Sequence, residues 1–104
     1  MSLNRYNPKR DSNEAEIIAE LRVRGFAVWQ NSGPGIPDLI CVRAGVWHVA
    51  EVKSSTGTYT EAQKRFNKQA AERAGKVWLL RNKKDAMLMD MHTPGGPKDY
   101  APLL

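Results

Sequence analysis

The sequence predicts an α/β fold in which a mixed central sheet is flanked by helices. Two stretches, residues 12–24 and 60–74, repeat apolar residues at helical spacing and are bounded by capping residues and glycines. Four short stretches rich in β-branched and aromatic residues have strand character. The order is helix, three strands, helix, strand, and a helix between two strands usually makes those strands parallel. The sheet should therefore contain both parallel and antiparallel pairs.

The length and composition of the chain are typical of a single globular domain. The chain has 104 residues, of which 41% are hydrophobic and 26% charged. It has no apolar run of the roughly 18 residues that a membrane span needs, and no secretory signal opens it. The single cysteine, Cys41, excludes an internal disulfide, so we expect a cytoplasmic location. A formal net charge of +5 favours a polyanionic partner such as nucleic acid.

Three segments are expected along the chain. Residues 1–11 are basic and lack hydrophobic periodicity, which is typical of a flexible arm. Residues 12–92 should form the single folded domain. Residues 93–104 are rich in proline and glycine and should form an irregular tail.

The first helix is expected over residues 12–24. At 100° per residue, Ile17, Ile18 and Leu21 form one narrow stripe that should face the core. Glu14 falls in the middle of this stripe and should point inward. A first-turn acid also favours the helix dipole, so a purely structural role for Glu14 stays open.

The remaining elements follow from turn and capping signals. Ala44-Gly45 should close an antiparallel hairpin, and Thr60 to Gln63 has the pattern of a capping box. In the second helix Phe66, Ala70 and Ala74 should face inward. We expect strands at residues 26–31, 38–43, 46–54 and 76–80, and a short third helix at residues 85–91.

Charged residues interrupt two of the apolar strands. Glu51 and Lys53 share one strand face with Trp47 and Val49, and the hairpin should bring Asp38 close to them. Buried charge is costly unless it is paired or holds a metal, and two adjacent carboxylates attract a hard divalent cation. The alternative is a solvated Glu51–Lys53 pair on an exposed face, with Asp38 simply starting a strand.

The candidate site residues occur along the chain in an order that is similar to a known family pattern. The order Glu14, Gly-Ile-Pro-Asp38, Glu51-Val52-Lys53 and Gln63 resembles the PD-(D/E)XK nuclease superfamily. The forms Gly-x-Pro-Asp and Glu-x-Lys, followed by a glycine and Gln63, are most similar to its VRR-NUC branch. Residues 14–26 also resemble the opening of archaeal Holliday-junction resolvases. The resemblance covers about residues 12–81.

The resemblance implies a restriction-endonuclease-like α-β-β-β-α-β core and a role for each residue of the series. Asp38 and Glu51 would be ligands of Mg²⁺ or Mn²⁺, with the backbone carbonyl of Val52 as a third ligand. Lys53 would act on the attacking water. Glu14 would complete the metal site, and Gln63 would lie beside it. The implied activity is hydrolysis of phosphodiester bonds in DNA, with branched DNA such as Holliday junctions and a homodimeric enzyme favoured.

Other interpretations remain open at this point. The chain could be a non-catalytic DNA-binding module of the same fold, or a flap-cleaving or restriction-like nuclease. Gln63 could serve only as the third residue of the capping box, and the tryptophans are more typical of a core or an interface than of base stacking. One cysteine and two histidines do not make a zinc site. The candidate DNA contacts are Arg5, Lys9, Arg10, Lys64, Arg65 and Lys68.

Overall fold

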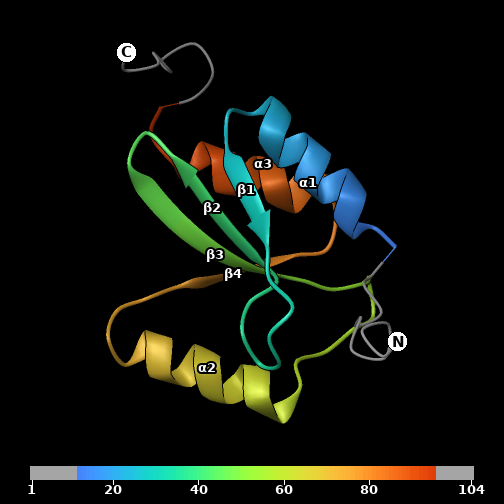
Figure 1. The fold of residues 1–104 in the computed structure, drawn as a ribbon, viewed down its shortest axis with the longest axis vertical. Helices are drawn as coiled ribbons and strands as arrows, with labels where there is room; N and C mark the ends of the chain where they lie inside the picture. The colour runs from blue at the N-terminus through green and yellow to red at the C-terminus, as the bar shows by residue number, and fades with distance from the viewer. Residues whose placement is uncertain (1–11, 96–104) are drawn as a thin grey trace, which may run out of the picture.

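The computed structural model describes residues 12–95 and shows a four-stranded sheet with three helices (Figure 1). The predicted order of elements is confirmed, and the third helix starts two residues before its expected position at residue 85. None of the helices in this part of the chain is long and apolar enough to cross a membrane. The elements are α1 (Glu14–Val23), β1 (Ala27–Gln30), β2 (Leu39–Arg43), β3 (Val46–Val52), α2 (Glu61–Ala71), β4 (Val77–Leu80) and α3 (Lys83–Met91).

The sheet has the strand order β1-β2-β3-β4 and is mixed, as predicted. β2 pairs antiparallel with both β1 and β3, whereas β3 and β4 are parallel. Ala44 and Gly45 close the hairpin between β2 and β3 with φ angles of 52° and 80°. Both residues are therefore in the left-handed region, as a two-residue hairpin turn of this kind requires.

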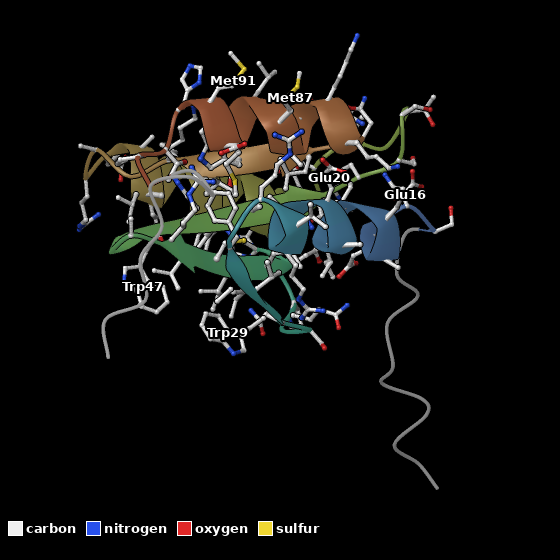
Figure 2. All side chains as sticks on the ribbon, turned by 90° about the horizontal axis from the view of Figure 1, so that it is seen from above. Glu16, Glu20, Trp29, Trp47, Met87 and Met91 are labelled. Atoms are coloured by element: carbon white, nitrogen blue, oxygen red, sulfur yellow. The ribbon has the colours of Figure 1, made fainter. Side chains whose placement is uncertain are left out.

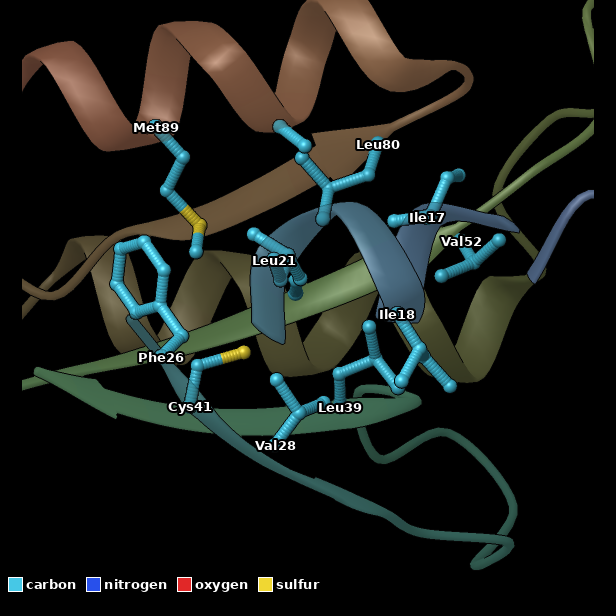
Figure 3. Packing of buried hydrophobic residues seen from close by; sticks show 12 residues of the cluster. Ile17, Ile18, Leu21, Phe26, Val28, Leu39, Cys41, Val52, Leu80 and Met89 are labelled. Atoms are coloured by element: carbon cyan, nitrogen blue, oxygen red, sulfur yellow. The ribbon is translucent and has the colours of Figure 1, made fainter. Parts of the chain in front are cut away.

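The core lies between one face of the sheet and the pair α1 and α3, which lie side by side (Figures 1 and 3). The inward stripe predicted for α1 is confirmed, because Ile17, Ile18 and Leu21 are all buried. Cys41 is fully buried, and this burial raises the pKa of its thiol to about 12, so it acts as a small hydrophobic residue. The other core members are Phe26, Val28, Leu39, Ala50, Val52, Leu80, Ala86 and Met89.

α2 lies apart from this layer, and none of its residues is fully buried (Figure 1). Phe66 and Ala70 are half-buried on the predicted inward side, but Ala74 is exposed. The prediction for Ala74 was wrong because the helix ends at Ala71. Ala74 itself adopts a φ of 61°, which belongs to the turn leading to β4.

Two tryptophans lie on the surface rather than in the core. Trp29 and Trp47 are 51% and 63% exposed, and their rings stack with centroids 6.1 Å apart (Figure 2). Of the three tryptophans only Trp78 packs against the core, where its Nε1 donates a hydrogen bond to His48 Nδ1 at 3.1 Å. Of the two positions expected for the tryptophans, core or interface, exposure excludes the core for Trp47, since this part of the sheet lacks a covering helix.

A buried arginine ties the end of α3 and the segment that follows it to the sheet. The side chain of Arg43 is fully buried, and its Nη1 contacts Asp90 Oδ1 at 2.5 Å. Burial would raise the pKa of Asp90, but hydrogen bonds from Arg24 and Arg43 outweigh this effect and lower it. Arg43 also donates to the backbone carbonyls of Arg24, Asp90, Thr93 and Pro94. Thr93 is thus packed into the domain.

Replacing Arg43 by alanine should lower the free energy of unfolding by about 3–5 kcal/mol, because the substitution leaves several buried acceptors without a donor. Urea denaturation followed by circular dichroism measures this loss. Lys84→Ala, at an exposed position of α3, is the control and should change stability by less than about 0.5 kcal/mol. A loss below about 1 kcal/mol for Arg43→Ala would show that the network contributes little.

Candidate functional site

The register of the hairpin places two carboxylates next to each other. Leu39 pairs with Ala50, so the preceding Asp38 lies opposite Glu51 at the end of β3. Asp38 Oδ2 accepts a hydrogen bond from the backbone N–H of Val52 at 2.8 Å. The juxtaposition expected from the sequence is confirmed, and it depends on the turn at residues 44–45 fixing the register.

Glu51 is an ionisable side chain in the interior, with 1% of its surface exposed. Its Oε1 atom is buried and has no hydrogen-bond partner among the described residues. Burial, a side-chain hydrogen bond with Asp38 and the charge of Asp38 raise the pKa of Glu51 to about 8, while the charge of Lys53 opposes the rise. In the absence of a bound cation, the Glu51 carboxyl group therefore holds a proton at neutral pH.

The backbone of Lys53 is fixed on both sides. Its N–H donates to the carbonyl of Leu80 at 3.2 Å, and its carbonyl accepts a hydrogen bond from Asn13 Nδ2 at 3.1 Å. Asn13 Nδ2 also bonds the carbonyl of Arg81 at 2.7 Å, so the start of α1 joins the ends of β3 and β4. A Cβ at Gly57 would lie 3.2 Å from Ser54 Oγ and 3.4 Å from Lys53 Cδ, so the loop after β3 passes close to the lysine side chain.

Glu14 points inward from the first turn of α1, as predicted, and is 3% exposed. Its Oε2 accepts a hydrogen bond from Gln30 Nε2 at 3.0 Å. Gln30 pairs with Leu39 in the sheet, so it follows Val28 on the face of β1 that α1 covers. The two residues hold a carboxylate at the edge of the core, beside the end of β1.

The loop between β1 and β2 reaches towards α2 (Figure 1). Gly35 has a φ of 73°, and a Cβ there would lie 2.8 Å from the Cβ of Ala62. Only glycine allows this approach, because both the backbone conformation and the space exclude a side chain. Asn31 donates its backbone N–H to the carbonyl of Asp38 at 2.7 Å, which closes the base of the loop.

Gln63 takes part in the capping box that opens α2. Its Oε1 accepts from the N–H of Thr60 at 2.9 Å, and its own N–H donates to Thr60 Oγ1 at 3.2 Å. The capping role is therefore present. Its Nε2 makes no hydrogen bond within the described residues, so the amide can still donate towards the adjoining cavity.

A cavity of about 350 Å³ brings most of the predicted site residues together. The loop after β1 and the start of α2 complete its wall. Glu51 does not line the cavity itself and lies buried behind Asp38. The predicted residues that line it are Glu14, Asp38, Val52, Lys53 and Gln63.

The donor set suits a hard divalent cation, although within residues 12–95 no three metal-binding side chains converge. No group of three or more His, Cys, Asp and Glu side chains in residues 12–95 is arranged to hold a metal. Glu14 is therefore not part of a preformed cluster with Asp38 and Glu51. Asp38 and Glu51 still offer adjacent carboxylate oxygens, and Glu51 Oε1 is buried without a hydrogen bond from the described residues.

The predicted DNA contacts divide between described and undescribed parts of the chain. Lys64, Arg65 and Lys68 are exposed on α2, and Lys64 Nζ lies 3.2 Å from Glu61 Oε2. The candidates of the N-terminal arm, Arg5, Lys9 and Arg10, lie outside the described residues.

Three residues of the site escaped the sequence reasoning. Asn13 stands just before the first helix, where capping residues are common, but it bridges two strand ends. Gln30 continues the Phe26–Val28 alternation, so a polar residue at an inward position was the available signal. Tyr59 lies near Glu51, and its pKa is raised by burial and by the charge of Glu51. No sequence signal marks Tyr59, since it stands in an irregular loop.

The comparison with solved structures bears on the fold. A structure described as a VRR_NUC domain matches with a TM-score of 0.63 and 21% sequence identity, over 79% of this chain and 98% of that chain. No protein-family model and no curated protein matches the sequence. The chain therefore has the fold of a VRR_NUC domain, as the sequence motifs predicted.

The raised pKa of Glu51 predicts how stability depends on pH without metal. Unfolded glutamate has a pKa of about 4.3, so between about pH 4.5 and pH 8 the unfolded chain releases the proton that folded Glu51 retains. In EDTA the free energy of unfolding should fall across this window relative to Glu51→Gln, by about 4–5 kcal/mol, and stay level above it.

Urea titrations at several pH values, on the wild type and Glu51→Gln, measure this difference. Subtracting the variant removes the contributions of the histidines, which titrate in the same range. Glu16→Gln, at an exposed position, should follow the wild type at every pH. A constant difference between the wild type and Glu51→Gln would contradict the raised pKa.

Proposed function

We propose that the protein is a divalent-metal-dependent endonuclease that hydrolyses phosphodiester bonds in DNA. The observation that carries the proposal is the cavity in which Asp38, Lys53 and Glu14 meet, with buried Glu51 directly behind Asp38. A solvated ion pair on an open sheet face would not bury Glu51 to 1% exposure. The VRR_NUC fold and the net charge of +5 are consistent with a nuclease acting on a polyanion.

Asp38 and Glu51 would hold Mg²⁺ or Mn²⁺, with the backbone carbonyl of Val52 as a third ligand. Such an ion lowers the pKa of bound water and stabilises negative charge on a phosphate. Asp38 is oriented for this role by the hydrogen bond from the N–H of Val52. Glu51 can exchange its proton for a cation because its Oε1 has no competing donor in the described part of the chain.

As a cation, Lys53 would orient the attacking water and attract the phosphate; as a neutral amine, it would instead accept the proton of that water. Its backbone is held from both sides, which limits the positions that the ammonium group can reach. Glu14, fixed by Gln30, faces the same cavity and can accept a hydrogen bond from a water molecule there. Gln63 can donate from Nε2 while its Oε1 caps α2.

Removing a metal ligand or the lysine should abolish cleavage but leave the fold intact. Asp38→Asn and Lys53→Ala should each reduce the Mg²⁺- or Mn²⁺-dependent cleavage rate by about 100-fold or more, since each removes a charge that acts on the reacting groups. The rate is measured on labelled DNA with and without EDTA, and circular dichroism checks the fold.

Arg73→Gln is the matched control, because it removes an exposed charge from the turn after α2, at a residue that does not line the cavity. Undiminished cleavage by Asp38→Asn or Lys53→Ala would reject the site. If no divalent metal supported cleavage of any DNA tested but the wild type bound DNA, the non-catalytic binding module would be the correct interpretation.

Within the nuclease class we propose branched DNA as the substrate and a homodimer as the active form. A four-way junction needs two symmetric cuts, and a dimer with two-fold symmetry supplies two active sites in the required relation. This proposal rests on the resemblance of residues 14–26 to junction resolvases. The flap-cleaving and restriction-like alternatives use the same chemistry on other DNA shapes.

A panel of a four-way junction, a flap and a linear duplex, all of the same sequence, distinguishes these substrates. The junction should be cut fastest, in two symmetric strands, and light scattering should give the mass of a dimer. Faster cutting of the flap or the duplex would identify one of the alternatives, and a monomeric active enzyme would exclude the dimer.

A further inference from the structure

A second cavity lies beside the first and differs from it in charge. Two carboxylates, Glu14 and Asp38, line the first cavity, whereas the charged side chains of the second are cationic. Its volume is about 330 Å³, and it shares Lys53 with the candidate active site. Three of its lining residues are cationic, two carry hydroxyl groups, and no acidic residue of the described chain lines it. The lining residues are Lys53, Thr58, Tyr59, Lys64, Leu79 and Arg81.

The sheet topology explains why cations gather here. Val52 pairs with Leu80 in the parallel ladder, so Lys53 and Arg81 follow on neighbouring strands, whose spacing is about 4.8 Å. Both side chains extend on the strand face that also carries Glu51 and Leu79, because alternate residues share a face. Lys64 reaches the same cavity from α2. Three elements thus direct positive charge to one place.

Hydrogen bonds hold Arg81 in place and leave part of its guanidinium group available to a ligand. Its Nη1 donates to the carbonyl of Ser54, and its backbone N–H donates to Asp85 Oδ2 at 2.8 Å. Nε and Nη2 make no hydrogen bond within the described residues, so this edge of the guanidinium is available for a phosphate. Lys64 pairs with Glu61 at 3.2 Å, but both side chains are mostly exposed and such a surface pair is weak.

We propose that this second cavity, lined by Arg81, Lys64 and Lys53, binds a backbone phosphate of the same DNA strand, next to the phosphate in the first cavity. This rests on the proposed function for its substrate and extends it to a second, non-reacting phosphate. Lys53 lines both cavities, so they adjoin at this side chain and a strand bound in the first can continue into the second. Leu79 and the ring of Tyr59 supply an apolar surface for the sugar.

The test neutralises one phosphate at a time. A labelled DNA junction is prepared in versions that each carry a single methylphosphonate, and the affinity of each is measured in EDTA to prevent cleavage. For the wild type, one position should lower affinity by about tenfold when neutralised, because a charge-assisted hydrogen bond is lost. In Lys64→Gln and in Arg81→Gln the same position should have less than about a twofold effect.

Arg73→Gln should respond to the neutralised position as the wild type does, because its exposed charge does not line the cavity. Lys64→Gln keeps the test informative if Arg81→Gln disturbs the loop at Ser54, since Lys64 is 59% exposed and does not contact that loop's carbonyl. An equal drop in all four proteins would overturn the proposal.

A titration with inorganic phosphate distinguishes a site for a DNA backbone phosphate from a site for free phosphate. Saturable amide shifts at Lys64 and Arg81 with inorganic phosphate, combined with no position effect on DNA, would show a site for free phosphate and overturn the proposal. The affinity measurements on neutralised phosphates do not depend on whether the protein cleaves DNA. A position effect in a protein that never cleaves would support this site and refute the nuclease, and cleavage without a position effect would do the reverse.

Discussion

The pairing of Asp38 with Glu51 across β2 and β3 is the constraint on which the rest of the site depends. A carboxyl group that is 1% exposed and lies beside a second carboxylate is costly to bury. The fold tolerates this cost by keeping a proton on Glu51 and by directing the N–H of Val52 at Asp38. A divalent cation would serve the same purpose while leaving both groups ionised.

Several contacts of long sequence separation hold the cavity around this pair. Asn13 joins the start of α1 to the ends of β3 and β4, and Gln30 orients Glu14. The close approach of Gly35 to Ala62 fixes α2 against the loop before β2, although α2 contributes no fully buried residue. The cavity is thus formed by the ends of elements whose packing is determined elsewhere in the core. Arg43 and Asp90 stabilise the opposite end of the sheet.

Much of this arrangement could be predicted from the sequence because it is local or periodic. The stripe with Glu14, the hairpin turn at residues 44–45 and the alternation along β3 together place Asp38, Glu51 and Lys53 correctly. Features set by tertiary packing could not be predicted in this way. The inward position expected for Ala74 was wrong because it depends on where α2 ends, and whether Trp47 lies in the core or on the surface depends on where that helix lies. The bridge made by Asn13 and the cationic cavity behind Lys53 join strand ends that only the parallel β3–β4 register brings together.

Titration of the protein with Mn²⁺ in a calorimeter tests most directly whether the carboxylate pair is a metal site. The wild type and the exposed-site variant Glu16→Gln should bind Mn²⁺ with the same affinity. Asp38→Asn and Glu51→Gln should each bind at least about tenfold more weakly, because each removes an anionic oxygen ligand. Equal affinity in all four proteins would place the metal elsewhere, and a wild type that bound no metal would contradict the account.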